Sequence, residues 1–350
     1  MGIRERVKRT LKDLISIPSP SGKEDAIQRY IEERLRSVGI EPVRQQVEGG
    51  RFNLIWRSGS EYLISCHVDT VPPINMKRAY IPVEKNGTIR GRGASDVKGA
   101  LASLLTAVEL AGDEPPFSLA FVVDEENNTA LGSERILELL KGIRYALVLE
   151  PTYGKFCTKQ MGSLEFTLKV KGRTAHGAEF EKVENPVKVL FKIVSKVEER
   201  TSRPVNLLMV RGGSRHYLVP GECEALAEVK VFEGEAWEEV ERGVREALGA
   251  VGTSCTVEYR LEDAENFLDF GSDGFARKLM ESYRRATGKE TSTGVMPSWT
   301  DAANYHRAGI RCVVFGEGSL IDSHTERESI REEELERMTL FFLQLFRDLG

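Results

Sequence analysis

Three short segments in the first half of the chain decide how the rest is interpreted: EYLISCHVDTVP (residues 61–72), GRGASDVKG (residues 91–99) and VDEEN (residues 123–127). Each lies at the end of a predicted strand or at the start of a predicted helix. Residues two apart in a strand project on the same side, which places His67 beside Asp69. We therefore expect His67 to bind a metal ion while the Asp69 carboxylate fixes the imidazole tautomer and raises its basicity.

Asp96 and the acid pair Glu125-Glu126 extend this hypothesis. Asp96 precedes the apolar-periodic run 97–110, which predicts a position where a loop becomes a helix. Each feature has a plain alternative. The His67 and Asp69 side chains could form an ordinary local hydrogen bond, Asp96 could cap its helix, and adjacent glutamates are usually a solvated turn. Their order along the chain, each near a strand end, favours one shared site.

Composition limits the class of protein. At 350 residues the chain is long enough for two domains, and its net charge of -5 with interspersed signs gives no basic surface for nucleic acid or membrane. The first residues lack the apolar core of a signal peptide, and no run of about 18 apolar residues occurs, so we expect a cytoplasmic protein. The cysteines lie mostly in apolar runs without paired spacing, which indicates buried thiols: Cys66, Cys157, Cys223, Cys255 and Cys312.

Apolar periodicity predicts alternating helices and strands in residues 1–159. Helices are expected at 4–17, 24–38, 97–111 and 132–141, and strands at 41–47, 53–56, 62–65, 118–123 and 146–149. This alternation predicts an α/β fold with a mainly parallel sheet covered by helices on both faces. Sites in such sheets lie beyond the carboxyl ends of the strands. That is where His67, Glu125, Glu126 and Glu150 fall, so one crevice would collect them.

The pattern changes after Glu150. Strands are expected at 164–170, 205–211, 224–232 and 254–261, with helices at 186–199 and 236–248. This order predicts a self-contained α+β unit at 160–262, inserted into a larger domain formed by 1–159 and 263–350. The last part resumes the first domain with a helix at 274–287, a strand at 312–315 and a helix at 331–346. The loop after the strand delivers His324.

The collected side chains suit a pair of divalent metal ions. Two histidines and three carboxylates offer mixed nitrogen and oxygen ligands, with Zn²⁺ the default and Co²⁺ or Mn²⁺ possible. The candidate ligands are His67, Asp96, Glu126, Glu150 and His324. Metal-bound water needs a base to receive its proton, and Glu125 is the acid left over for that role.

With these motifs the chain resembles the M20 metallopeptidase and deacylase family along essentially its whole length. The resemblance rests on SCHVDTVP (65–72), GRGASDVKG (91–99), DEE (124–126), EP (150–151) and His324. It implies a zinc-exopeptidase-like α/β domain in which Asp96 bridges two metal ions. His67 and Glu150 would complete one metal position, and Glu126 and His324 the other. Glu125 matches the general base of the family.

The resemblance also assigns a role to the inserted unit, which looks like the lid and dimerisation domain of the family. Its segment GRTAHG (172–177) matches the loop whose histidine enters the active site of the partner protomer. His176 would there stabilise the oxyanion of the tetrahedral intermediate. This implies a homodimer whose catalytic residues are Asp69, Glu125 and, from the partner copy, His176.

Within the family, the short length, Glu150 in place of aspartate and MGSLE (161–165) look most like hydrolases that release lysine or ornithine from a small acidic amino-group carrier protein in lysine and arginine biosynthesis. Acetylornithine deacetylase and succinyl-diaminopimelate desuccinylase are the nearest alternatives. An M20 dipeptidase or aminopeptidase and a non-catalytic metal-binding protein are the remaining ones.

Two positions depart from the family pattern. Tyr217 replaces an asparagine and Lys230 an arginine, and both of those residues help relatives hold the substrate carboxylate. Lys230 and Arg215 are therefore the candidate substrate-binding residues. Arg215 is either a substitute for the missing contact or an ordinary surface charge.

Overall fold

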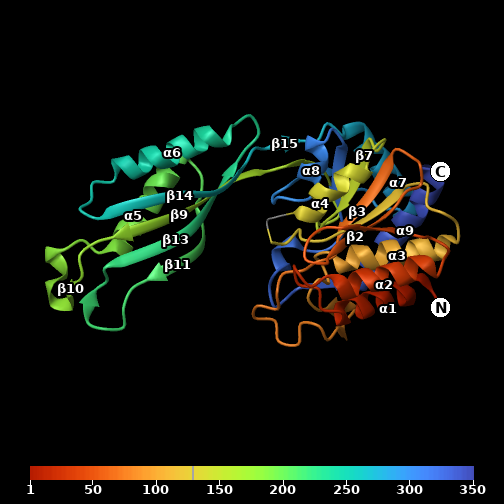
Figure 1. Cartoon of the computed structure of the whole chain (residues 1–350), viewed down its shortest axis with the longest axis horizontal. Coiled ribbons are helices and arrows are strands. Elements are labelled where there is room, and N and C mark those ends of the chain that lie inside the picture. The colour runs from red at the N-terminus through yellow and green to blue at the C-terminus, as the bar shows by residue number, and fades with distance from the viewer. Residues whose placement is uncertain (128–129) are drawn as a thin grey trace. The chain divides into compact units, whose positions relative to one another are not determined.

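The computed structural model describes residues 1–127 and 130–350. It divides into two compact units, one formed by Met1–Lys159 with Asp269–Gly350 and the other by Gln160–Leu268 (Figure 1). The second boundary lies later than the expected residue 262, because the last long strand of the smaller unit continues to Glu265. None of the described helices is long and apolar enough to cross a membrane.

The larger unit is built on a nine-stranded sheet with the order β1-β2-β6-β3-β7-β17-β8-β15, in which β16 also pairs with β8. Its strands are β1 (Val43–Gln46), β2 (Phe52–Trp56), β3 (Tyr62–His67), β6 (Ser118–Val122), β7 (Tyr145–Leu149), β8 (Phe156–Gln160), β15 (Leu268–Asp269), β16 (Thr293–Met296) and β17 (Arg311–Phe315). The four central strands, β6, β3, β7 and β17, run parallel. Flanking pairs are antiparallel, so the fold is mixed α/β with a mainly parallel centre.

Alternate residues of the central strands face different helices, as the period of two in a strand requires. Ile64 and Cys66 of β3 join the apolar core shared with the long helices, whereas the Ser65 hydroxyl lies 2.7 Å from the Tyr305 hydroxyl on the other face. The long helices are α1 (Ile3–Ser16), α2 (Asp25–Arg36), α3 (Lys98–Ala111), α7 (Asp273–Thr287) and α9 (Glu332–Asp348), and the short ones are α4 (Leu131–Ile136) and α8 (Ala302–Arg307). Figure 1 shows α1, α2 and α3 side by side over one face of this sheet.

A small sheet beside the main one was not expected from the sequence. It has the order β18-β5-β4 and joins β4 (Val83–Lys85), β5 (Thr88–Arg90) and β18 (Ser329–Arg331). The sequence pattern also missed β8, β15, β16 and α8. The helix expected at 132–141 is shorter, because α4 gives way to a 3₁₀ turn at Leu137–Leu139.

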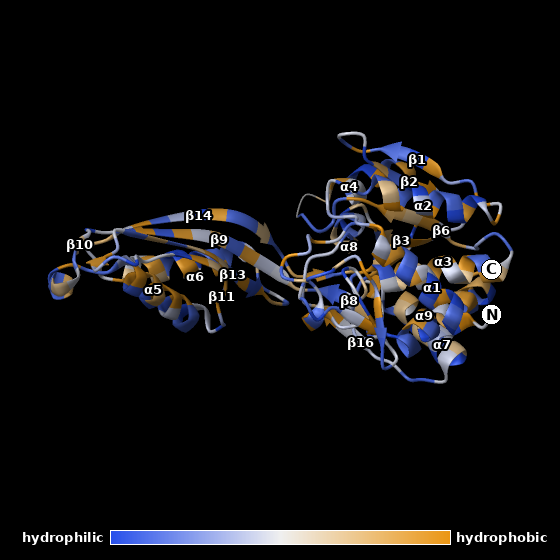
Figure 2. Ribbon diagram, turned by 90° about the horizontal axis from the view of Figure 1, so that it is seen from below, coloured by the Kyte–Doolittle hydropathy of each residue, from blue (hydrophilic) through white to orange (hydrophobic). Residues whose placement is uncertain are grey.

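The smaller unit is a four-stranded antiparallel sheet with two helices on one face, visible in Figure 2 as α5 and α6 along one side of the strands. Its elements are β9 (Gly162–Lys171), β11 (Asn206–Gly212), β13 (Glu222–Val231), β14 (Thr256–Glu265), α5 (Pro186–Thr201) and α6 (Trp237–Ala250), and a separate pair joins β10 (Ala175–His176) to β12 (Leu218–Val219). Two more 3₁₀ turns lie at Gly177–Lys182 in this unit and at Leu320–Asp322 in the larger one. Asn185 begins α5 by accepting a hydrogen bond from the Val187 N–H, and Pro186 takes the first helical position. Burial alternates strictly along β9, so this unit has its own apolar core under the two helices.

Candidate metal centre

The parallel strands bring four segments of the chain to one edge of the larger unit. His67 is the last residue of β3, Glu150 directly follows β7, and Glu125 and Glu126 follow β6. The fourth segment leaves β17 and reaches His324 after a 3₁₀ turn. Since these strands are neighbours and parallel, their carboxyl ends meet in one place. Four of the five candidate ligands are therefore gathered by the sheet itself, and the fifth, Asp96, lies just before α3.

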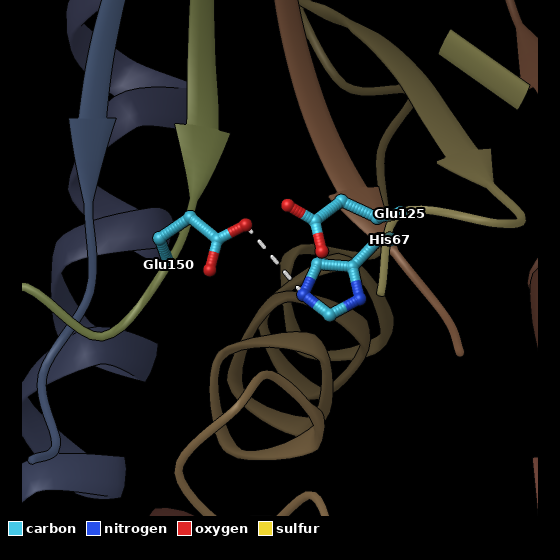
Figure 3. A group of neighbouring side chains, drawn as sticks. All are labelled: His67, Glu125 and Glu150. Carbon is cyan, nitrogen blue, oxygen red and sulfur yellow. Dashed lines mark ion pairs between the residues drawn. The ribbon is translucent and has the colours of Figure 1, made fainter. Parts of the chain in front are cut away.

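One group of ligand atoms forms around His67. Its Nε2 atom lies 3.3 Å from Asp96 Oδ1 and 3.5 Å from Glu150 Oε1. Figure 3 shows the Glu150 carboxylate facing this imidazole, with the Glu125 side chain directed into the same space. His67, Glu125 and Glu150 each offer an atom within 4.8 Å of the others. This is enough to hold one cation with Glu125 beside it.

A second group forms around His324. Its Nε2 atom lies 2.9 Å from Glu126 Oε2 and 3.4 Å from Asp96 Oδ2. The two oxygens of Asp96 thus face two different imidazoles, one in each group. An aspartate in this position can bind two cations at once, which agrees with the bridging role that the family resemblance implies.

Glu150 is fixed by its backbone. Its N–H donates to the Phe315 carbonyl at 3.2 Å, where β7 and β17 end together. A Cβ atom on Gly316 would lie 2.4 Å from the Glu150 carbonyl oxygen. Only glycine allows this close approach of the two strand ends. One of these ends carries Glu150, and the other leads to His324.

Asp69 acts on the site differently from the sequence expectation. His67 Nδ1 lies 3.1 Å from the main-chain carbonyl oxygen of Asp69 and 3.6 Å from its carboxylate. A carbonyl can only accept a hydrogen bond, so Nδ1 carries the proton and Nε2 is left free to bind a cation. The tautomer is therefore set mainly by the backbone of Asp69 rather than by its side chain.

The Asp69 carboxylate instead organises the acid pair. Oδ1 accepts the N–H of Glu125 at 3.1 Å, and Oδ2 accepts the N–H of Glu126 at 3.0 Å and the Ser21 hydroxyl at 2.7 Å. The group is buried, and burial alone would raise its pKa. The imidazole of His67 and these donors outweigh burial and lower the pKa of Asp69. The Asp69 carboxylate is therefore an anion that holds the backbone of both glutamates in place.

The three glutamates of the site have raised pKa values in the protein without bound metal. Burial raises the pKa of Glu126 to about 7, and neighbouring Asp96 adds to the shift. Burial also raises the pKa of Glu150 to about 7, against the effect of His67. The pKa of Glu125 rises well above its ordinary value, first through burial and then through Glu150. Buried carboxyl groups this close together are stable as anions only when positive charge lies beside them.

The pKa values of the two imidazoles are also raised, which favours their positively charged form. Burial would lower the pKa of His324, but Asp96 and Glu126 outweigh it and raise the pKa to about 10. Burial likewise opposes the rise in the pKa of His67, which Glu150 and Asp69 produce. Protons on these imidazoles take the place that metal ions would occupy, since a ligand must lose its proton to bind a metal.

A pair of divalent cations fits these residues. Glu126 Oε1 is buried and accepts no hydrogen bond from any residue that the structure describes. Each position offers one imidazole nitrogen, one terminal glutamate and one oxygen of Asp96, a donor set that suits Zn²⁺ or Co²⁺. The cations would balance the desolvated carboxylates, so the donor set and the charge both fit.

Two residues of this region were missed by the sequence analysis. Arg92 and Glu328 form a buried ion pair next to Asp96. Arg92 lies inside the GRGASDVKG segment, and Glu328 lies four residues after His324. Their proximity to candidate ligands was the only available signal.

The remaining candidate residues lie in the smaller unit. His176 is exposed, its Nδ1 accepts the Ala178 N–H at 3.3 Å, and its ring meets the Tyr217 ring edge to face at 5.3 Å. Arg215 is exposed in the loop between β11 and β12. The half-buried Lys230 ammonium is paired with Glu228. None of these three lies in the unit that carries the metal centre.

Comparisons with known proteins find sequence similarity over most of the chain. The model of "Peptidase family M20/M25/M40" matches residues 63–348. A probable carboxypeptidase of Emericella nidulans is 27% identical over 93% of this chain and 85% of its own length. A succinyl-diaminopimelate desuccinylase of Nautilia profundicola is 25% identical over 96% and 98%.

Solved structures share the fold of the chain. A tripeptidase of Staphylococcus aureus is 20% identical, with a TM-score of 0.81 over 99% of this chain and 98% of that one. A dinuclear metal binding peptidase of Bacillus subtilis is 18% identical, with a TM-score of 0.66 over 98% and 97%. These similarities extend over both units of the chain.

Proposed function

Because this chain belongs to peptidase family M20/M25/M40, we propose that it hydrolyses a linear amide C–N bond at a centre of two divalent metal ions, Zn²⁺ or Co²⁺. The observation that carries the proposal is the position of Glu125. It lies beside His67 and Glu150, yet the two sets around His67 and His324 need no further carboxylate. A spare acid next to a metal pair is what a hydrolase requires and a simple metal carrier does not.

The residues divide the reaction between them. When bound, the ions would polarise the scissile carbonyl and make water a stronger acid. Glu125 accepts the proton of the attacking water and passes it to the leaving nitrogen, so that water and the amide give a carboxylate and an amine. In the protein without bound metal its pKa is raised by burial and then by Glu150, so this carboxylate takes up a proton more readily than an exposed glutamate. Asp69 holds the backbone of this base in place.

For the substrate we propose a carrier-protein amide, with release of lysine or ornithine. The support is the sequence: Glu150 where other members have aspartate, and MGSLE at 161–165. The desuccinylase relative favours the second candidate, a deacylase of a small N-acylated amino acid such as acetylornithine or succinyl-diaminopimelate. The carboxypeptidase relative keeps peptide hydrolysis as the third.

The proposal includes a homodimer in which each copy lends His176 to the other copy's site. Three observations support a role for this part of the smaller unit. His176 is exposed, and the aromatic side chains of Phe180 and Tyr217 near it are 55% and 73% exposed. The Nδ1 atom accepts a backbone N–H, which leaves Nε2 as the donor toward an oxyanion.

One assay separates the substrates. The metal-loaded protein is given lysine- or ornithine-loaded carrier protein, acetylornithine, succinyl-diaminopimelate and dipeptides, and the released amine is measured by mass spectrometry. Glu125→Gln serves as the control against contaminating hydrolases. The highest kcat/KM on the carrier supports the narrower proposal, and a higher value on small amides or dipeptides refutes it. A protein with two bound ions that cleaves none of them is not the proposed enzyme.

A further inference from the structure

A buried ion pair lies behind the metal centre. The Arg92 Nη1 atom donates to Glu328 Oε2, and the two side chains are 1% and 0% exposed. Removing two charges from water costs several kcal/mol, and an apolar pair would often be as stable. A buried ion pair next to a candidate ligand therefore needs a reason other than stability, and its remaining contacts supply one.

Glu328 holds the segment that carries the shared ligand. Its second oxygen, Oε1, accepts the backbone N–H groups of Ser95 and Asp96, both at 3.2 Å. The Glu328 carbonyl accepts the Gly91 N–H at 3.3 Å. One acidic residue thus fixes the backbone on both sides of Arg92, and directly at Asp96, before α3 begins.

Arg92 holds the segment that carries the second histidine. Its Nη2 atom donates to the Pro73 carbonyl at 3.2 Å and lies 3.5 Å from the His324 carbonyl. His324 has φ +63°, a left-handed backbone conformation that a non-glycine residue adopts only when its surroundings hold it. A guanidinium directed at its carbonyl is such a constraint.

The two metal positions differ in how firmly they are supported. His67 is the last residue of a central strand and 1% of its side chain is exposed, and Glu150 is fixed by strand ends. The side chain of His324 is 49% exposed, and it lies in a loop after a 3₁₀ turn. The position formed by Asp96, Glu126 and His324 therefore depends on the ion pair more than the position formed by His67, Asp96 and Glu150.

We propose that Arg92 and Glu328 are positioning residues that hold Asp96 and His324 together, so that losing either one selectively weakens the second metal position. This inference rests on the proposed two-metal function. Loss of groups that orient metal ligands typically costs about 10- to 100-fold in affinity. We expect that loss at one position and a clearly smaller one at the other.

The test is a titration of metal-free protein with Co²⁺, followed by calorimetry and by the visible absorption of the bound ion. Wild type should bind two ions. Arg92→Met and Glu328→Gln should bind the second ion about 10- to 100-fold more weakly, and the first ion, which His67 and Glu150 still hold, with a clearly smaller loss. Circular dichroism establishes that each variant is folded. If Arg92→Met does not fold, Arg92→Lys replaces it: one ammonium keeps the charge toward Glu328 but cannot also reach the His324 carbonyl.

Arg44→Met is the matched control. Arg44 pairs with the buried carboxylate of Glu32 in the same unit and lies over the Phe52 ring, and neither of these residues is a candidate ligand. It should bind two ions as wild type does. Variants of Arg92 and Glu328 that keep both affinities, lose both equally, or do no more than Arg44→Met would overturn the inference. A wild type with fewer than two ions would instead overturn the proposed two-metal function.

Discussion

The carboxylate of Asp69 accepts the backbone N–H of Glu126 at 3.0 Å, and its other oxygen accepts that of Glu125 at 3.1 Å. The main-chain carbonyl of the same residue lies against His67 Nδ1. One residue therefore orients a metal ligand through its backbone and the acid pair through its side chain. The two functions can be separated by substitution.

Asp69→Asn should lower kcat about 10- to 100-fold and weaken the metal position that includes Glu126, while the ion at His67 stays bound. The amide turns one acceptor into a donor that faces a backbone N–H, which displaces the acid pair, whereas the carbonyl toward His67 remains. The measurements are kcat and metal content. Ser21→Ala is the control because it removes only the hydroxyl bonded to Asp69, and its effect should be smaller. Equal kcat values for the two variants would contradict this assignment.

Glu125→Gln should keep both ions but lower turnover by about 10²- to 10⁴-fold, because the amide cannot accept the proton of water. Metal analysis and steady-state rates check this. Glu126→Gln is the neighbouring comparison and should lose the second ion, since Glu126 lies 2.9 Å from His324 Nε2. A Glu125→Gln protein that turns over normally would remove the base assignment. One that loses an ion would make Glu125 a ligand.

The metal-free protein should be less stable at pH 7 than at about pH 5. The pKa of Glu126 and of Glu150 is about 7 in the folded protein, against an ordinary 4.5. A raised carboxyl pKa means that the folded state binds protons more tightly, so stability falls as the pH rises between these values. His324, whose pKa is raised from 6.5 to about 10, acts in the same sense, fully at low pH and decreasingly as the pH rises.

Thermal unfolding checks this dependence. The Tm of the metal-free protein should fall by a few degrees or more between those two pH values, and added Zn²⁺ should raise Tm more at pH 7. The double variant Glu126→Gln, Glu150→Gln should flatten the dependence because neither amide titrates. A metal-free wild type whose Tm rises over this range, or a double variant with the same slope, would show that these two carboxyl groups are not the cause.

Mixing two inactive variants should restore activity if His176 acts on the partner copy. Protomers with His176→Ala and protomers with Glu125→Gln form heterodimers in which one site has both residues intact. Each homodimer should be about 10²- to 10³-fold slower than wild type or worse, as for the loss of an oxyanion donor. Activity should return as subunits exchange. Exchange without recovery, or a fully active His176→Ala protein, would rule out this role.

The long elements of the fold were predictable because their burial is periodic. The helix expected at 4–17 is Ile3–Ser16, and the strand expected at 164–170 is Gly162–Lys171 with alternating burial. Elements that carry no period were missed. The strands of the small sheet have three residues each, and α8 is buried along most of its six residues. Elements this short contain too few residues for a period to be recognised.

The candidate site likewise has features that the sequence predicts and features that it does not. The residues gathered at the metal centre could be proposed from strand ends, because neighbouring parallel strands bring their carboxyl ends together. Contacts made by the backbone could not. The hydrogen bond to His67 Nδ1 comes from a main-chain carbonyl, which every residue has. The pairing of Arg92 with Glu328 joins residues 236 apart, and nothing local in the sequence indicates it.

The strand order has a consequence for how the protein is made. β7 and β8 are consecutive in this part of the chain, yet β17 lies between them in the sheet. A nascent chain that has left the ribosome up to residue 268 contains the whole smaller unit, whereas the larger sheet still has an open slot with unpaired N–H and C=O groups along β7. Such edges can template aggregation until they are covered. Residues 311–315 fill the slot, and His324 follows nine residues later. Translation thus delivers the closing strand and the last candidate ligand almost together, after the smaller unit.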